Sequence, residues 1–254
     1  MMYDSFSKAY DRFVNWENRL RLEIPFLVEQ LKNVNATSVL DSACGTGMHV
    51  IALAQQGFIV AGADFSAGMI AQAKENAQSE GVNIPFYLAG FGELATTLEP
   101  QQFGAVLCLG NSLPHLLTSQ ALYAAFLDFY QCLLPGGIVI IQNRNFDLVV
   151  KQRDRWMEPQ SYQEEGKEWL FLRFYDYEPS GVITFNIMTL SRMAEGDWEQ
   201  EITSTQLNPT QSDELTDALK LIGFEDLECF GNMEGATYNP EKSGNLVVLA
   251  RKPI

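Results

Sequence analysis

Short apolar runs and stretches with helical spacing alternate along the chain. Four apolar runs in the first half predict strands, at residues 38–41, 58–64, 84–89 and 105–109. The stretches between and after them predict helices, at residues 48–56, 66–80 and 122–134. Residues 138–142 follow a Pro-Gly-Gly turn and are apolar throughout, as a strand buried on both faces requires. Strands that alternate with helices predict right-handed crossovers and a parallel sheet.

The pattern changes at both ends of this region. Helical spacing predicts a helical segment over residues 4–33, in which Pro25 kinks the helix or starts a second one. Three β-rich stretches separated by turn signals follow residue 146, at 167–177, 181–191 and 198–207. A helix with Ser212 as its expected N-cap and two last strands complete the chain, at 212–221, 224–230 and 246–251.

We therefore expect an α/β fold with one domain over residues 1–254. It consists of a Rossmann-like seven-stranded sheet and an antiparallel β subdomain that is inserted after the fifth strand. The N-terminal helical segment covers 1–33 and the insertion covers 146–207. Ligands of such sheets bind at the carboxyl ends of the strands, near the point where the strand order reverses.

Composition narrows the classes of function. The 254 residues carry a net charge of −15 without a cluster of lysine or arginine, which argues against a nucleic-acid substrate. No apolar run approaches the roughly 20 residues that a membrane span needs. The first ten residues lack the apolar stretch of a secretory signal, so a cytoplasmic protein is expected. A homo-oligomer is neither required nor excluded.

Cysteine and histidine spacing predicts no metal site. The four cysteines lie far apart, at positions 44, 108, 132 and 229, and the two histidines are His49 and His115. No Cys-x-x-Cys pair occurs, and zinc sites depend on such spacing. Free thiols are the simplest interpretation.

The segment VLDSACGTGMHV, residues 39–50, places two glycines between a strand and a helix. Gly45 and Gly47 allow a sharp turn and let backbone N–H groups approach a phosphate or a carboxylate; without a ligand they form only a tight turn. A dinucleotide fingerprint needs a third glycine where Val50 stands, which disfavours a nicotinamide-dependent dehydrogenase. Asp64 ends the next strand, where a carboxylate accepts ribose hydroxyls or caps the following helix.

Taken together, these segments resemble class I S-adenosylmethionine-dependent methyltransferases. The resemblance rests on DSACGTG, on Asp64 in VAGADFSAGM, on Ala89-Gly90-Phe91, on CLGNSL and on LLPGG. It covers residues 39–142 and 212–252, and its specificity lies in the order and spacing of the pieces. The resemblance implies S-adenosyl-L-methionine as the cofactor and a small molecule as the methyl acceptor.

A closer resemblance is to glycine/sarcosine N-methyltransferases. It is carried by CLGNSLPHL at 108–116 and PGGIVIIQNRNFD at 135–147, together with Arg19 and Tyr10. The family has histidine where this chain has Asn143 and tyrosine where it has Phe146. The resemblance implies methyl transfer to a small-molecule amine, for example glycine or sarcosine. An O-methyltransferase of a small metabolite and a cofactor-binding protein without activity are the alternatives.

The resemblance implies a set of cofactor contacts. Asp41, Ala43, Gly45 and Gly47 are expected around the methionine portion, and Arg19 near its carboxylate. The remaining expected contacts, with ribose, adenine and the sulfonium, are Tyr10, Asp64, Phe65, Met69, Gly90, Phe91, Leu109, Gly110 and Asn111. Phe91 could equally belong to the core, and Arg19 could be a solvated helix residue.

Other residues are candidates for catalysis and acceptor binding. Asn145 is the first candidate for contact with the acceptor because an amide both donates and accepts, although it could cap a loop instead. Arg144 and His115 are the other catalytic candidates, and His115 as a lone histidine is more often structural. In the insertion, Arg173 or Arg153 could hold a carboxylate, and Tyr175 could line the acceptor pocket.

Overall fold

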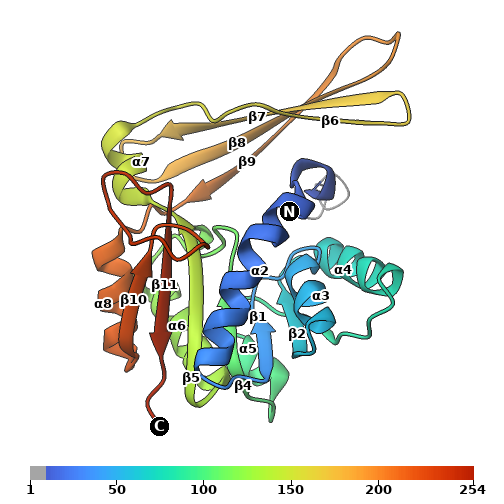
Figure 1. Cartoon of the computed structure of the whole chain (residues 1–254). Coiled ribbons are helices and arrows are strands. Elements are labelled where there is room, and N and C mark those ends of the chain that lie inside the picture. The colour runs from blue at the N-terminus through green and yellow to red at the C-terminus, as the bar shows by residue number, and fades with distance from the viewer. Residues whose placement is uncertain (1–9) are drawn as a thin grey trace.

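A computed structural model describes residues 10–254 of the chain and contains the expected Rossmann-like sheet (Figure 1). Seven strands follow the order β10-β11-β5-β4-β1-β2-β3. Their bounds are β1 Ser38–Asp41, β2 Ile59–Asp64, β3 Phe86–Leu88, β4 Phe103–Cys108, β5 Leu133–Arg144, β10 Glu225–Phe230 and β11 Asn245–Arg251. Strands β1 to β5 run parallel, and β11 is antiparallel to both of its neighbours. The strand order reverses between β1 and β4.

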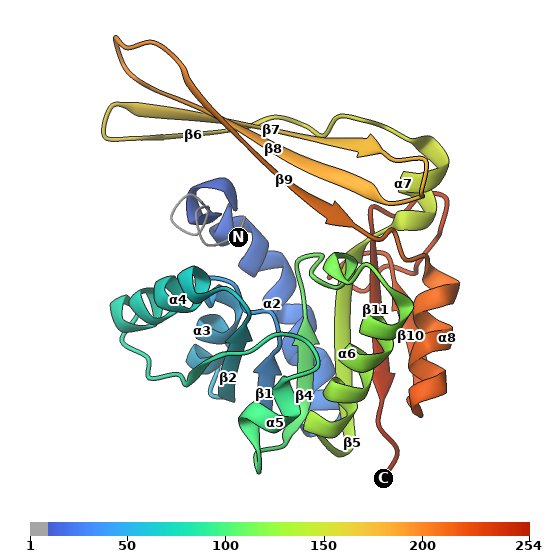
Figure 2. The ribbon, with the colours of Figure 1, turned by 180° about the vertical axis from the view of Figure 1, so that it is seen from behind.

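Helices cover both faces of this sheet (Figures 1 and 2). One face carries α2 Trp16–Asn33, α3 Met48–Gln55 and α4 Ala67–Ser79, and the other carries α5 Leu94–Leu98, α6 Ser119–Cys132 and α8 Ser212–Ile222. Because strand side chains alternate, Val106 of β4 joins the core beneath α6 while Leu107 joins the core beneath α2. Both are fully buried, and this burial on two faces explains the unbroken apolar runs in the sequence.

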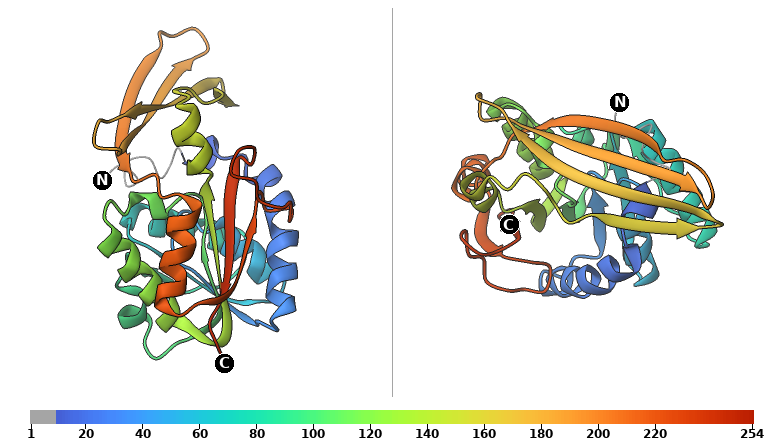
Figure 3. Two further views of the ribbon diagram at one scale, coloured as in Figure 1. Left: turned by 90° about the vertical axis from the view of Figure 1, so that its left-hand side faces the viewer. Right: turned by 90° about the horizontal axis from the view of Figure 1, so that it is seen from above.

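A second sheet lies over the carboxyl ends of the parallel strands (Figure 3). It is antiparallel, in the order β6-β7-β8-β9, and its strands are β6 Gln160–Glu164, β7 Lys167–Tyr177, β8 Ile183–Met193 and β9 Glu199–Leu207. The helix α7, Phe146–Gln152, joins it to the end of β5. The predicted insertion of an antiparallel sheet after the fifth strand is therefore confirmed, although α7 and the short polar edge strand β6 were not predicted.

The N-terminal helical region differs from its prediction. Residues 4–9 of the predicted helix lie outside the described residues. Residues 10–13 are helical, and α2 begins anew after Asn15, whose side chain caps it by accepting from the Asn18 N–H at 3.0 Å. Helix α2 continues through Pro25, because the buried side chains that follow, Phe26 and Leu27, fix this face of the helix against the sheet.

Two further local predictions are corrected, and one helix was not predicted. The Pro135–Gly137 segment belongs to β5, which begins at Leu133, instead of forming a turn before the strand. Gln211 occupies the N-cap position of α8, and the Ser212 N–H donates to Asp147 Oδ2 at 3.1 Å. Helix α5 was not predicted, because its first N–H groups are satisfied by a carboxylate far away in sequence, that of Asp128.

None of the helices within residues 10–254 combines the length and the apolar character needed to cross a membrane.

Candidate functional site

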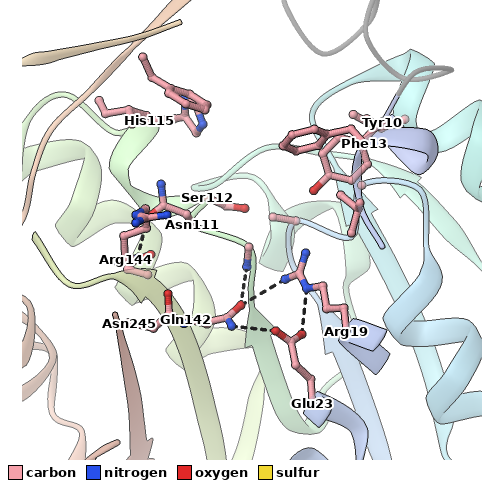
Figure 4. Close-up of a pocket in the computed structure, with 18 of the residues that line it drawn as sticks. Tyr10, Phe13, Arg19, Glu23, Asn111, Ser112, His115, Gln142, Arg144 and Asn245 are labelled. Carbon is pink, nitrogen blue, oxygen red and sulfur yellow. Dashed lines mark hydrogen bonds and ion pairs between the residues drawn. The ribbon is translucent and has the colours of Figure 1, made fainter. Parts of the chain in front are cut away.

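A cavity of about 810 Å³ opens where the carboxyl ends of the parallel strands meet the second sheet (Figure 4). Its walls come from the ends of β1, β2, β4 and β5, from α2, from the second sheet and from the loop after β10. This is the place at which open parallel sheets bind ligands, beside the reversal of strand order. Its size is within the usual range for a small-molecule site.

The two loop glycines serve different purposes. Gly45 has φ +54° and lines the cavity, and among residues 10–254 an added Cβ would meet only the Tyr10 ring, 4.0 Å away. Gly47 has φ +83° and does not line the cavity. A Cβ there would lie 3.0 Å from that of Ala73 and 3.1 Å from the ring of Phe86. Gly45 therefore leaves room for a ligand, whereas Gly47 allows α3 and α4 to pack closely.

Asp64 is buried at the cavity wall with its carboxylate already oriented. Its Oδ2 accepts the Gly45 N–H and its Oδ1 accepts the Ser66 N–H, each at 2.9 Å. Ser66, and not Asp64, caps α4, because its hydroxyl accepts the Met69 N–H. An oriented carboxylate at a cavity wall is a suitable acceptor for hydroxyl groups of a ligand.

Asp41 lies behind the glycine loop and does not line the cavity. Its side chain is 1% exposed and accepts the Ala43 N–H at 3.2 Å. Burial, with a contribution from the negative charge of Asp64, raises the pKa of Asp41 to about 7. Asp41 therefore holds the loop that carries Ser42 and Ala43, both of which face the cavity.

Arg19 belongs to a buried network that joins α2 to the end of β5 (Figure 4). Its Nε donates to Glu23 at 3.1 Å and its Nη2 donates to Gln142 Oε1 at 3.2 Å. Gln142 also donates to Glu23 at 2.9 Å and accepts the Gly110 N–H at 3.1 Å. The predicted residues Arg19 and Gly110 are thus brought together by Glu23 and Gln142, which the sequence analysis missed. The position of Glu23, one helical turn after Arg19, was the available signal.

The charges in this network are fixed by burial and hydrogen bonding. Burial alone would raise the pKa of Glu23, but the hydrogen bond with His49 at 2.6 Å and the charge of Arg19 outweigh it and lower the pKa to about 2. Burial lowers the pKa of His49, so its imidazole is neutral at pH 7. Arg19 and Glu23 therefore form one balanced ion pair at the cavity wall.

A second group of predicted residues forms the wall next to β2 and β3. Phe65, Met69, Gly90 and Phe91 all line the cavity. The Phe91 ring also packs edge to face on Phe129, with centroids 5.5 Å apart. Phe91 therefore contributes to the core and to the cavity at once.

Leu109 and Asn145 do not line the cavity. Leu109 is 3% exposed and packs in the core beneath α2. Asn145 caps α7, donates to the carbonyls of Pro240 and Ser243 at 2.9 Å each, and accepts from Tyr238 Oη at 2.7 Å. Its amide is fully used in holding the loop before β11, which differs from the acceptor contact expected from the sequence.

The part of the cavity beneath the second sheet is cationic. Arg144, Arg173 and Tyr175 line it, and no carboxylate within residues 10–254 forms a salt bridge with either arginine. Burial first, and then the charge of Arg144, lower the pKa of Arg173. The Arg173 guanidinium stacks on the Phe13 ring at 4.9 Å. Two guanidinium groups facing one cavity favour an anionic ligand.

His115 and Asn111 complete this part of the site (Figure 4). His115 lines the cavity, and burial lowers its pKa to about 4, so the imidazole is neutral at pH 7. Asn111 has φ +67°, and its side-chain oxygen accepts the Arg144 N–H at 2.9 Å. Asn111 therefore fixes the backbone at the end of β5. Arg153 does not line the cavity and stacks on Tyr177 at 4.6 Å.

Comparisons with known proteins agree with this geometry. Residues 39–137 match the family described as a methyltransferase domain. Glycine/sarcosine N-methyltransferase from Aphanothece halophytica is 27% identical over 249 residues, covering 98% of this chain and 89% of the relative. An S-adenosylmethionine-dependent methyltransferase from Clostridium acetobutylicum superposes with a TM-score of 0.80 at 16% identity, covering 99% of both chains. An amino pentose methyltransferase from Micromonospora echinaspora gives 0.75 at 20% identity, covering 98% of this chain and 97% of its own.

Proposed function

The chain is an S-adenosylmethionine-dependent methyltransferase, and on that premise we propose that it methylates the amino group of a small molecule that carries a carboxylate. The pair of unpaired guanidinium groups at Arg144 and Arg173 carries this proposal. Two half-buried guanidinium groups without a carboxylate partner are costly unless a ligand balances them, and a carboxylate accepts from guanidinium N–H groups with matching geometry. Glycine and sarcosine, the acceptors named for the Aphanothece relative, have this chemistry.

The other end of the cavity fits the cofactor. Gly45 leaves space beside the loop, and the Asp64 carboxylate, which lines the cavity at the end of β2, is the proposed acceptor for the ribose hydroxyls. Phe65 and Phe91 offer apolar surface for the adenine. Arg19, which shares its charge with Glu23, has donor capacity left for the methionine carboxylate.

We propose that the second sheet covers the acceptor. It supplies Arg173 and Tyr175 from β7, together with Phe185 and Ile187 from β8, to the cavity roof. Phe13, from the segment before α2, packs edge to face on Phe171 of the same sheet at 5.4 Å. This contact joins the roof to the wall that holds Arg19. A closed roof excludes water and strengthens the electrostatic interactions inside the cavity.

Bound S-adenosylmethionine supplies a methyl group on a positively charged sulfur. The acceptor nitrogen forms a bond to the methyl carbon as the carbon–sulfur bond breaks; the bonding pair stays on sulfur, and the nitrogen then releases a proton. No protein nucleophile is required. The residues of this chain contribute by orientation, which can be worth roughly 7–11 kcal/mol when both partners are held in near-attack positions.

A methyl-transfer assay with matched acceptors tests the proposal. Glycine and sarcosine supply both an amine and a carboxylate, methylamine lacks the carboxylate, and glycolate offers a hydroxyl in place of the amine. We expect turnover with the amino acids, a kcat/KM for methylamine that is at least about tenfold lower, and none with glycolate. Preference for methylamine would contradict the role of the guanidinium pair. Turnover of glycolate alone would establish an O-methyltransferase instead.

A further inference from the structure

A small set of buried polar atoms has no hydrogen-bond partner, and all of them belong to residues of one cavity. Within residues 10–254 these atoms are Asn143 Nδ2, Asn143 Oδ1, Arg144 Nε, Gln160 Oε1 and Arg173 Nε. They come from β5, β6 and β7, which belong to two different sheets. Buried polar atoms in folded proteins are nearly always paired, so such a cluster indicates a ligand that completes them.

Asn143 is the residue of this set in which both polar side-chain atoms lack a partner. Its side chain is 2% exposed, and neither its oxygen nor its nitrogen has a partner. It lies on β5 between two residues that are fixed by other contacts, because Gln142 belongs to the Arg19 network and the Arg144 N–H donates to Asn111. Reversing the amide would leave two unpaired atoms all the same, so the conclusion does not depend on which atom is oxygen.

The unpaired atoms define what the ligand must offer. The Asn143 amide nitrogen and the two Nε atoms supply four N–H donors, whereas the oxygens of Asn143 and Gln160 are acceptors. A carboxylate satisfies several donors but no acceptor. The ligand must therefore also bring a hydrogen-bond donor of its own, and the N–H groups of the proposed acceptor amine supply one.

We infer that Asn143 is a specificity-determining residue whose amide oxygen accepts an N–H of the acceptor amine. The inference rests on the proposed function. A free primary amine has two N–H groups, a secondary amine has one, and a tertiary amine has none. Asn143 therefore favours amines that still carry hydrogen, and a tertiary amine leaves its oxygen buried without a partner. Leaving a buried acceptor unpaired lowers kcat/KM roughly 5- to 150-fold.

The role also predicts an unusual effect on stability. Asn143→Leu keeps the branched outline of the side chain, and the cavity that Asn143 lines leaves room for the larger leucine. The substitution removes an amide that the ligand-free protein buries at a cost. We expect the melting temperature without ligand to rise by roughly 2–6 °C. The matched control is Asn186→Leu, because Asn186 is 6% exposed and its amide is bonded to Asp176 and Ser204. That control should lower the melting temperature, since it removes one hydrogen bond from each of these two partners.

The experiment measures methyl transfer to glycine, sarcosine and N,N-dimethylglycine by wild type and Asn143→Leu, with melting temperatures for both leucine variants. For wild type, kcat/KM for glycine and for sarcosine should be at least about tenfold higher than kcat/KM for N,N-dimethylglycine. In Asn143→Leu the three kcat/KM values should lie close together, and the melting temperature should rise. An unchanged ratio between the amines in Asn143→Leu overturns the inference, and so does a melting temperature that falls as in Asn186→Leu. Absence of turnover by wild type with all three amines would instead overturn the proposed function.

Discussion

The guanidinium of Arg19 donates a hydrogen bond to the side-chain oxygen of Gln142 at 3.2 Å, although 123 residues separate them in sequence. The bond ties α2 to the end of strand β5. The same oxygen accepts the Gly110 N–H, so the loop after β4 is held by the same contact. The residue expected to bind the cofactor carboxylate is thus oriented by groups from two distant parts of the chain.

The Arg19 network predicts that Glu23→Gln weakens cofactor binding. Loss of the carboxylate leaves the Arg19 charge unbalanced and its orientation loose. We expect the Kd for S-adenosylhomocysteine to rise roughly tenfold or more in calorimetric titration. Glu29→Gln, at an exposed position on the same helix, should leave the Kd unchanged. Equal values for wild type and both variants would contradict a positioning role for Glu23.

The lowered pKa of Glu23 makes a prediction about stability and pH. The pKa falls from 4.5 when unfolded to about 2 when folded, so the ionised carboxylate stabilises the fold by roughly 3 kcal/mol. This contribution is complete above pH 4.5 and disappears as the pH falls towards 2. In denaturant unfolding, wild type and Glu23→Gln should differ most near pH 6 and converge near pH 2. If the free energies of unfolding of wild type and Glu23→Gln differ by the same amount at every pH, the prediction is wrong.

The raised pKa of Asp41 predicts that stability decreases with rising pH, which is opposite to the trend for Glu23. Its pKa rises from 3.8 when unfolded to about 7 when folded, so the folded state binds the extra proton between these values. The free energy of unfolding should therefore decrease as the pH rises from about 4 to about 7, by at most roughly 4 kcal/mol from this group. Asp41→Asn should flatten this part of the curve. If the curve of the variant runs parallel to that of wild type, Asp41 is ionised in the folded protein.

Asp64→Asn should weaken cofactor binding while the protein still folds. The amide retains one acceptor oxygen but loses the charge and part of the capacity to accept ribose hydroxyls. Hydrogen bonds to charged groups are worth about 1.5–3 kcal/mol, so the Kd should rise roughly 10- to 150-fold. Circular dichroism checks the fold, and Glu195→Gln, in an exposed turn, serves as the control. An unchanged Kd would show that Asp64 does not contribute to cofactor binding.

Arg173→Met should impair binding of the acceptor and leave the cofactor site intact. Methionine keeps much of the apolar contact with Phe13 but removes the charge. We expect KM for glycine to rise roughly 10- to 100-fold with little change in the Kd for S-adenosylhomocysteine. Arg173→Lys should retain part of the affinity, and Arg192→Met, on β8 outside the cavity, should change neither value. A rise in KM with Arg192→Met of similar size would indicate a general disturbance of the sheet.

The pH dependence of turnover should follow the acceptor amine. Only the free base attacks, so kcat/KM should climb between about pH 7 and pH 9. His115 does not change its charge in this range, because burial lowers its pKa to about 4. His115→Gln should therefore keep the shape of the profile. A flat profile in wild type would argue against an amine acceptor, and a shape altered by His115→Gln would assign the proton transfer to histidine.

The alternation of apolar runs and helical stretches was enough to predict the sheet and the insertion, and the resemblance carried by the motifs implied the cofactor. Alternating apolar runs and helical stretches are local consequences of burial on two faces, and the glycine loop with Asp64 lies on consecutive elements of the chain. Gly45 and Asp64 could therefore be chosen as candidates from the sequence, and both line the same cavity. The sequence could not show that Asn143, and not the predicted Asn145, lines the cavity. Both are amides near the end of the same strand.

Which of these two amides is available to a ligand depends on contacts that form only in the folded chain. The loop before β11, nearly a hundred residues later, occupies every hydrogen-bonding atom of Asn145 and none of Asn143. The same holds for Glu23 and Gln142, whose importance arises from contacts between α2 and β5. Whether a polar side chain serves the fold or a ligand depends on the partners that the folded chain places around it, and a pattern along the sequence does not contain them.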